Sequence, residues 1–306
     1  MNHICILLAT FNGADFLEKQ LASLLEQTHE SWSLLISDDG SEDDTINIIM
    51  RFIHANPNKE ISFFNGPKQG HVKNFLSLLN HDQANGDFFA FADQDDIWLP
   101  EKLATAVAQV NKIQDRGPKL YGGRTIIIDA NDTKINHSPL FVKEPSFLNA
   151  LVQNFAGGNT MLFNKEAKVA LQNTGCDVKV INHDWWAYLV ISGVGGTVIY
   201  DPDPQVLYRN HKMNIIGSNQ GLFARVKRIS AVLKGQYATW NAINVGELNK
   251  ILPMLRPKNK AVLEQFDQFR RSRGIKAVIK GHKTGFYRQT LFGNLSLYIA
   301  SFFGRV

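Results

Sequence analysis

Residues 88–100 read FFAFADQDDIWLP, an apolar run that ends in a cluster of carboxylates. The run Phe88–Ala92 is typical of a strand buried on both faces, and Asp93–Asp96 follows it directly. A second apolar run ends in the same way, at Asp38 and Asp39. Carboxylates crowded at strand ends repel one another, which a fold tolerates where a cation or a polar ligand compensates. Because ligands bind at the carboxyl ends of strands in open α/β sheets, the sequence predicts a ligand site where these two strands end.

Short apolar strands alternate with amphipathic helices in the first part of the chain. The pattern predicts strands at residues 4–9, 33–37, 61–65 and 88–92, and helices at residues 15–26, 46–53, 72–80 and from Pro100 onward. This order implies a parallel sheet with helices on both faces. After Gly117 the pattern changes. Strands at residues 125–129, 160–163, 198–200 and 206–208, with a helix at residues 184–192, are expected to complete the sheet and wall the site.

The distribution of charge divides the chain into two parts. The 306 residues have a net charge of +5, but residues 1–220 carry −8 and residues 221–306 carry +13. An acidic body with a basic tail predicts a boundary near Gly217–Gly221 and an anionic partner for the tail, such as phospholipid, nucleic acid or an anionic glycan. The hydrophobic content of 44% is enough for a sizeable core, and two cysteines argue against a disulfide framework.

The tail carries two apolar stripes at helical spacing. The first consists of Leu222, Val226, Ile229 and Leu233, and the second of Leu291, Leu295, Tyr298 and Phe302. Polar residues interrupt the second stretch, so it would lie on a membrane rather than cross one. The alternative is that both stripes pack on the body of the protein or on a second subunit. The basic charge of the tail favours contact with an anionic membrane.

The sequence offers no sign of export or of a membrane span. No apolar run approaches the length that crosses a bilayer, and the run Ile4–Ala9 is too short for a signal peptide and lacks a basic flank. We therefore expect a cytoplasmic protein that its tail holds at the inner face of the plasma membrane.

Six short motifs occur in a fixed order along residues 1–220. They are ATFNG at 9–13, DDGSEDDT at 38–45, DQDDIWLP at 93–100, GGNT at 157–160, HDWW at 183–186 and YRNHKMN at 208–214. In this combination the chain resembles an inverting family 2 glycosyltransferase of the GT-A fold, particularly the rhamnosyltransferase-like members that build bacterial surface polysaccharides. The resemblance implies a mostly parallel central sheet flanked by helices, with a catalytic domain at residues 1–220 and a basic helical extension at residues 221–306.

The resemblance also implies a donor site for a nucleoside-diphosphate sugar. It assigns Asp38 and Asp39 to the imide N–H of uracil or thymine and to the ribose, which suits a carboxylate acceptor. The residues expected to bind the donor are Thr10, Phe11, Asn12, Asp38, Asp39, Asp93, Gln94 and Arg209. Backbone amides of the ATFNG turn are expected to help hold the base or ribose, although an ordinary turn between strand and helix would look the same.

A divalent cation is expected beside the donor. Asp-x-Asp offers hard oxygen ligands that suit Mg²⁺ or Mn²⁺. The resemblance makes Asp95 the direct ligand, with Asp93 and His211 contributing, and the ion would neutralise the departing diphosphate. Asp96 is a candidate cap for the helix that follows Pro100, and His211 could equally be an ordinary surface or core histidine.

Asp184 is the candidate general base on the acceptor side. Transfer with inversion needs a carboxylate that deprotonates the acceptor hydroxyl opposite the leaving group. Family members often have Glu-Asp where this chain has His183-Asp184, so the second carboxylate is kept. The residues expected to line the acceptor pocket are Asn154, Gly158, Asn159, His183, Trp185 and Trp186. The two tryptophans could stack on a sugar, but core packing is expected for at least one of them.

The resulting hypothesis is transfer of a single sugar, from dTDP-rhamnose or a UDP-hexose, to a glycan or lipid-linked acceptor of lipopolysaccharide, capsule or exopolysaccharide. The Gln-x-x-Arg-Trp sequence of processive relatives is absent. The main alternative is an inactive module of the same fold that binds nucleotide, membrane or protein. Among the partners of the protein we also consider a second copy of the chain, in a homo-oligomer. A nucleotidyltransferase is disfavoured because the first turn lacks a basic glycine-rich loop. The acidic body disfavours a nucleic-acid binder.

Overall fold

The computed structural model describes residues 2–211 and 235–306. The first predicted stripe of the tail and Asn214 of the last motif lie outside these residues. The predicted boundary between residues 220 and 221 also lies outside them, so the division into two domains stays a prediction.

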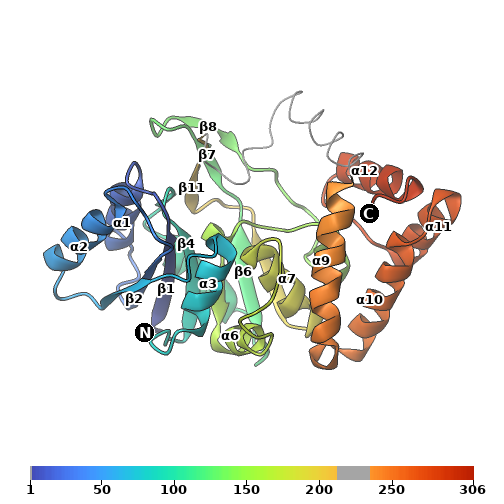
Figure 1. Ribbon diagram of the computed structural model, residues 1–306, viewed down its shortest axis with the longest axis horizontal. Coiled ribbons are helices and arrows are strands. Elements are labelled where there is room, and N and C mark those ends of the chain that lie inside the picture. Colours follow the sequence, from blue (N-terminus) through green and yellow to red (C-terminus); the bar gives the residue numbers. More distant parts are fainter. Residues whose placement is uncertain (1, 212–234) are drawn as a thin grey trace.

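A central sheet of seven strands organises the fold (Figure 1). Its strands, in spatial order, are β10 (Thr197–Asp201), β6 (Lys119–Gly123), β9 (Leu162–Asn164), β4 (Phe88–Asp93), β1 (Ile4–Thr10), β2 (Trp32–Asp38) and β3 (Ile61–Asn65). A smaller sheet contains β5 (Ile97–Trp98), β11 (Val206–Arg209), β7 (Ile126–Ile128) and β8 (Lys134–His137). Strands β1 to β4 are mutually parallel where they pair, whereas β9 runs antiparallel to both of its neighbours. The predicted mostly parallel sheet of the GT-A fold is confirmed.

Helices cover both faces of the central sheet. They are α1 (Leu17–Leu25), α2 (Thr45–Ala55), α3 (His71–Asn80), α4 (Lys102–Asn111), α5 (Phe147–Ala150), α6 (Lys165–Gln172) and α7 (His183–Gly193). Strand β1 is buried along its whole length, and successive residues of a strand point to opposite faces. Ile4, Ile6 and Leu8 accordingly pack with α1, α2 and α4, whereas Cys5, Leu7 and Ala9 pack on the side of α3, α6 and α7.

Four further helices complete the described part of the chain. They are α9 (Gln236–Lys250), α10 (Pro257–Arg270), α11 (Gly274–Thr284) and α12 (Leu291–Phe302). Figure 1 shows α9 beside α7, with α10 to α12 further out. Asn259 of α10 donates to the carbonyl oxygens of Ser192 and Gly193 at 3.0 and 2.8 Å. Asn149 of α5 donates to the Tyr287 carbonyl at 2.9 Å. These bonds fix the helices to the end of α7 and to α5.

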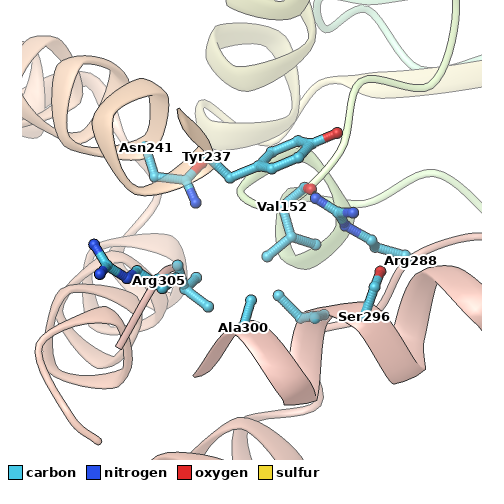
Figure 2. Close-up of a pocket in the computed structure, with 9 residues that line it drawn as sticks. Val152, Tyr237, Asn241, Arg288, Ser296, Ala300 and Arg305 are labelled. Atoms are coloured by element: carbon cyan, nitrogen blue, oxygen red, sulfur yellow. The ribbon is translucent and has the colours of Figure 1, made fainter. Parts of the chain in front are cut away.

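A small hollow marks where α9 and α12 meet the segment after α5 (Figure 2). It has room for about one water molecule, so it is a packing defect rather than a ligand pocket. Tyr237, Val152 and Ala300 line it, and the Arg288 guanidinium lies 4.7 Å from the centre of the Tyr237 ring. The face of α12 that packs on the body carries Leu297, Ala300 and Ser301, whereas Leu291, Leu295 and Phe302 of the predicted second stripe are exposed. In the described structure these three residues of the stripe therefore do not pack on the body of the protein, and their contact with a membrane or with a second subunit stays a prediction. Within the ranges 2–211 and 235–306, no helix is both long and apolar enough to cross a bilayer.

Candidate active site

Three strands of the central sheet end at the predicted ligand site. Thr10 ends β1, Asp38 ends β2 and Asp93 ends β4. Parallel pairing aligns Thr10 with Asp38 on one side of β1 and Ala9 with Asp93 on the other. The two carboxylate clusters therefore meet at one edge of the sheet, as the sequence predicts.

The buried Asp38 carboxylate ties together the loops that follow β1 and β2. Its Oδ2 atom accepts hydrogen bonds from the hydroxyls of Thr10 at 2.8 Å and Ser41 at 2.6 Å. Its Oδ1 atom accepts from the backbone N–H groups of Gly40 at 3.0 Å and Ser41 at 2.7 Å. Gly40 has a φ of 97°, which favours glycine and lets the turn fold back onto Asp38. Since a carboxylate offers about four lone-pair sites, these four bonds occupy Asp38 with loop positioning.

The Asp39 carboxylate binds the backbone of the loop that precedes α3. Its Oδ1 atom accepts from the backbone N–H groups of Lys68 at 2.6 Å and Gln69 at 3.3 Å, and its Oδ2 atom accepts from Gly70 at 2.6 Å. Three bonds leave about one lone-pair site of this carboxylate for a ligand. Of the two predicted nucleotide-contacting aspartates, Asp39 therefore has the better geometry for that contact.

The amides of the turn after β1 are already used by side chains of the protein. Phe11 donates to Gln94 Oε1 at 2.7 Å and Asn12 donates to Ser41 Oγ at 2.8 Å. Gly13 donates to Thr45 Oγ1 at 2.8 Å. The expectation that these amides hold a base or ribose is therefore corrected, because their hydrogens point to protein oxygens. Gln94 also donates to the Phe11 carbonyl at 2.9 Å, so two hydrogen bonds join its side chain to the Phe11 backbone. Phe11 itself is 53% exposed.

The predicted metal ligands lie together. Asp95 Oδ2 and His211 Nε2 are 2.7 Å apart. Burial, and then the nearby charges of Asp95 and Asp184, raise the pKa of Asp93 to about 8. Among the residues that the structure describes, no three Asp, Glu, His or Cys side chains form a metal-holding group by themselves. Mg²⁺ commonly takes one or two carboxylates and completes its shell with water and substrate phosphates. The Asp95 carboxylate and the His211 ring, in contact with each other and with Asp93 nearby, are donors of the kinds that suit such a partly hydrated cation.

Asp96 is a buried acceptor that joins the Asp93–Asp96 loop to Asn159 and to the Arg209 backbone, and it does not cap a helix. Its carboxylate is fully buried and accepts from the Asn159 side-chain amide and from the Arg209 backbone N–H at 3.2 Å. The N-terminal cap of α4 is Glu101, so the predicted cap at Asp96 is wrong. Asn159 is 3% exposed and committed to Asp96. In this structure its amide holds the Asp93–Asp96 loop, and its assignment to the acceptor pocket stays a prediction.

Arg209 is fully buried and braces the same loop. Its Nε atom donates to the Asp95 carbonyl at 2.8 Å, and Nη1 donates to the Asp129 carbonyl at 3.2 Å and to the Asp132 carboxylate. The guanidinium also lies 4.6 Å from the centre of the Phe16 ring. In this structure the side chain joins β11 to the Asp93–Asp96 loop and to the β7–β8 turn, and its predicted pairing with a phosphate stays a prediction.

Replacing Arg209 by Lys is expected to lower the free energy of unfolding by about 2–4 kcal/mol, because an ammonium cannot reproduce the planar fork that reaches three oxygen acceptors. Urea denaturation of the purified protein measures the change. Arg271→Lys is the matched control, since the Arg271 side chain is 73% exposed. A loss no larger than that of the control would contradict the bracing role of Arg209.

Asp184 occupies the first turn of α7 and faces the GGNT turn. Its Oδ2 atom accepts from the Gly158 N–H at 3.1 Å, and Oδ1 accepts from the Trp185 N–H at 2.6 Å. Burial raises the pKa of Asp184 to about 6. Its charge raises the pKa of Asp93, so the two carboxylates lie near each other. A buried carboxylate with a raised pKa is a candidate for a general base.

The other predicted acceptor residues are more deeply packed than the sequence indicates. Trp185 and Trp186 are 5% and 1% exposed and belong to the hydrophobic core. The proposal that either ring stacks on a sugar is therefore corrected. His183 lies 3.8 Å from the centre of the Phe75 ring, and burial lowers its pKa well below 6.5. A side chain at Gly158 would clash with His183 Nε2 at 2.5 Å, so glycine lets this ring and Asp184 pack against the turn.

Two supporting residues escaped the sequence analysis. Asn74 donates from its side chain to the Ser37 carbonyl at 2.8 Å, fixing α3 to the end of β2. The Asp132 carboxylate forms ion pairs with Arg209 and Lys19. Neither residue belongs to a motif, and each partner lies far away in the sequence, so no local signal marks them.

Comparison with known proteins gives the class of this chain. Residues 5–176 match Glycosyl transferase family 2, and the chain belongs to this family of glycosyltransferases. The dTDP-rhamnosyl transferase RfbG of Shigella flexneri is 28% identical over 247 residues, covering 75% of this chain and 80% of that protein. The chain spans less than half the length of other curated glycosyltransferases that it matches.

Solved structures share the fold. The TarS 1–349 fragment of S. aureus in complex with UDP-GlcNAc superposes with a TM-score of 0.55 and 14% identity, over 92% of this chain and 89% of that chain. The mannosyltransferase PcManGT of Pyrobaculum calidifontis, in complex with GDP-Man and Mn²⁺, gives a TM-score of 0.52 and 16% identity, over 98% of this chain and 86% of that chain. At these identities the likeness supports the GT-A fold alone.

Proposed function

We propose that this glycosyltransferase moves a single sugar, with inversion, from a nucleoside-diphosphate sugar to a glycan or lipid-linked acceptor. One observation carries the proposal. The candidate base Asp184 lies close enough to Asp93 to raise its pKa, and Asp93 stands beside Asp95 and His211 at the end of β4. An in-line displacement needs a proton acceptor on one side of the sugar and groups that hold the anionic leaving group on the other, and we assign these roles to Asp184 and to the Asp93, Asp95 and His211 side chains.

Asp184 would take the proton of an acceptor hydroxyl in the reaction. The oxygen then attacks the anomeric carbon from the face opposite the diphosphate, the bond to the diphosphate oxygen breaks, and the configuration inverts. The Gly158 and Trp185 N–H groups hold the Asp184 carboxylate in place during this step. A bound Mg²⁺ or Mn²⁺, held by Asp95, His211 and Asp93, would supply neutralisation of the charge on the leaving diphosphate.

The donor nucleotide would bind between the ends of β1 and β2. The remaining lone-pair site of Asp39 suits the imide N–H of thymine or uracil, and the exposed Phe11 ring offers a face for stacking on the base. We propose dTDP-rhamnose as the first donor, supported by the similarity to RfbG, with UDP-hexoses as the alternative. The product would be part of a lipopolysaccharide, capsule or exopolysaccharide.

Titration calorimetry tests this function with a panel of thymidine- and uridine-diphosphate sugars, each with and without Mn²⁺. We expect one donor to bind at least about tenfold more tightly with Mn²⁺ than without it, because the cation bridges the diphosphate and the carboxylates. The free nucleotides UDP and dTDP serve as controls for recognition of the base. Binding of no donor in the panel, with or without Mn²⁺, would contradict the donor assignment and favour the inactive-module alternative.

A further inference from the structure

Helix α12 presents a stripe of large apolar side chains on its outer face. Leu291 is 86% exposed, Leu295 56%, Ile299 45%, Phe302 47% and Phe303 57%. At 3.6 residues per turn these positions fall within an arc of about 120° around the helix axis. They therefore form one continuous strip, which we call the α12 stripe.

The opposite side of α12 already carries the packing contacts. Leu297, Ala300 and Ser301 are buried there, and Leu297 and Ala300 belong to the hydrophobic core. The outer face thus carries larger apolar side chains than the face that packs on the body. Contiguous exposed apolar surface of this kind marks an interaction site in soluble domains.

The segment of the chain that contains the α12 stripe carries one sign of charge. Residues 268–306 contain eight Lys and Arg and no Asp or Glu. Helix α11 packs against α12 and exposes Lys276, Lys280 and Lys283 beside two exposed isoleucines, Ile275 and Ile279. An apolar strip with basic residues nearby matches an interface of acyl chains and anionic headgroups.

We propose that the α12 stripe and the exposed lysines of α11 dock the enzyme on an anionic lipid bilayer. The charge argues against a second copy as the occupant, because two such faces would bring like charges together without acidic partners. Helix α12 has 12 residues, so it would lie in the plane of the interface rather than span it.

Flotation with vesicles tests the docking surface directly and needs neither donor nor acceptor. The full chain should bind vesicles of phosphatidylglycerol and phosphatidylcholine more tightly than vesicles of phosphatidylcholine alone. The triple variant Leu295→Gln, Ile299→Gln, Phe303→Gln should lose at least about tenfold in partitioning, because three large apolar groups leave the interface. The variant Lys276→Gln, Lys280→Gln, Lys283→Gln should lose roughly fivefold per lysine on the anionic vesicles only, and less at high salt.

A control variant replaces three exposed apolar side chains elsewhere. Ile135, Val142 and Val169 are 55%, 77% and 45% exposed and lie outside the C-terminal helices, and their triple Gln variant should bind vesicles as the unmodified chain does. Thermal unfolding shows that each variant is folded. Equal partitioning of the α12 variant and the control would overturn the proposal. So would an α12 variant that changes the sedimentation coefficient from dimer to monomer while vesicle binding stays the same, since that result assigns the face to a second copy.

Discussion

Replacing Asp184 by Asn is expected to reduce the rate of sugar transfer by about 10²–10⁴-fold while leaving donor affinity within about twofold of the unmodified enzyme. An amide has nearly the same shape but cannot accept the proton of the acceptor hydroxyl. The diphosphate side of the site, at Asp95 and His211, is untouched by this change. Single-turnover transfer and calorimetry with the donor measure the two quantities separately.

The pH dependence of the unmodified enzyme provides a second readout of the same group. Burial raises the pKa of Asp184 to about 6, so kcat should rise as the pH increases through about 6 and then level off. Asp177→Asn is the control, because the Asp177 side chain is fully exposed and lies on the approach to α7. A near-native rate for the Asp184 variant, with the same pH profile, would show that another residue is the base.

The stability of the Asp184 variant separates a catalytic effect from a folding defect. The folded-state pKa of about 6 lies above the ordinary value of 3.8, so the folded protein disfavours the carboxylate. The stability that the protonated carboxyl contributes is complete below pH 4 and is lost as the pH rises through 6, with a cost of about 3 kcal/mol. The Asn variant has no carboxyl group to ionise at this position, so it does not lose this stability as the pH rises. Its melting temperature relative to the unmodified protein should therefore increase between pH 4 and pH 7.

The sequence predicts those strands and helices whose apolar pattern is strong. Strand β3 has the predicted bounds, β1 and β4 are one residue longer at the end, and β2 is one residue longer at both ends. Strand β6 escaped because its sequence KLYGG reads as a loop. The structure explains one of these glycines, since a Cβ at Gly122 would lie 2.8 Å from Ala156 Cβ. The antiparallel direction of β9 is also invisible to periodicity, because a strand has the same alternation in either direction.

The site shows a similar division. The motifs predict which loops meet, but they do not predict which side chains serve the protein and which serve the ligand. Asp38, Asn159 and Arg209 all lie in motifs, and all three are occupied by hydrogen bonds within the protein. Asn159 and Asp96 are separated by 63 residues, and Arg209 reaches Asp95 across 114 residues. Hydrogen-bond partners this far apart in the sequence can be identified only from the folded structure. The same holds for the exposure of Phe11 and for the remaining lone-pair site of Asp39, because both depend on the contacts around these residues.

Replacing Asp95 by Ala is expected to weaken Mn²⁺-dependent binding of the nucleoside diphosphate by at least about 100-fold, while binding without Mn²⁺ changes little. Loss of a supporting residue around a metal already costs about 10–100-fold in affinity, and Asp95 is proposed as a direct ligand. Removing the carboxylate also leaves His211 without the acceptor that lies 2.7 Å from its Nε2 atom.

The experiment is a pair of calorimetric titrations with UDP and dTDP, in Mn²⁺ and in chelator. Asp82→Ala is the matched control, since Asp82 is an exposed carboxylate before the start of β4, at the other end of the strand that leads to Asp95. His211→Ala should give a smaller loss in Mn²⁺, because the carboxylates of Asp95 and Asp93 remain in place. If Asp95→Ala weakened binding equally in Mn²⁺ and in chelator, Asp95 would be supporting the donor loop rather than the cation. The metal would then have to be assigned to other residues.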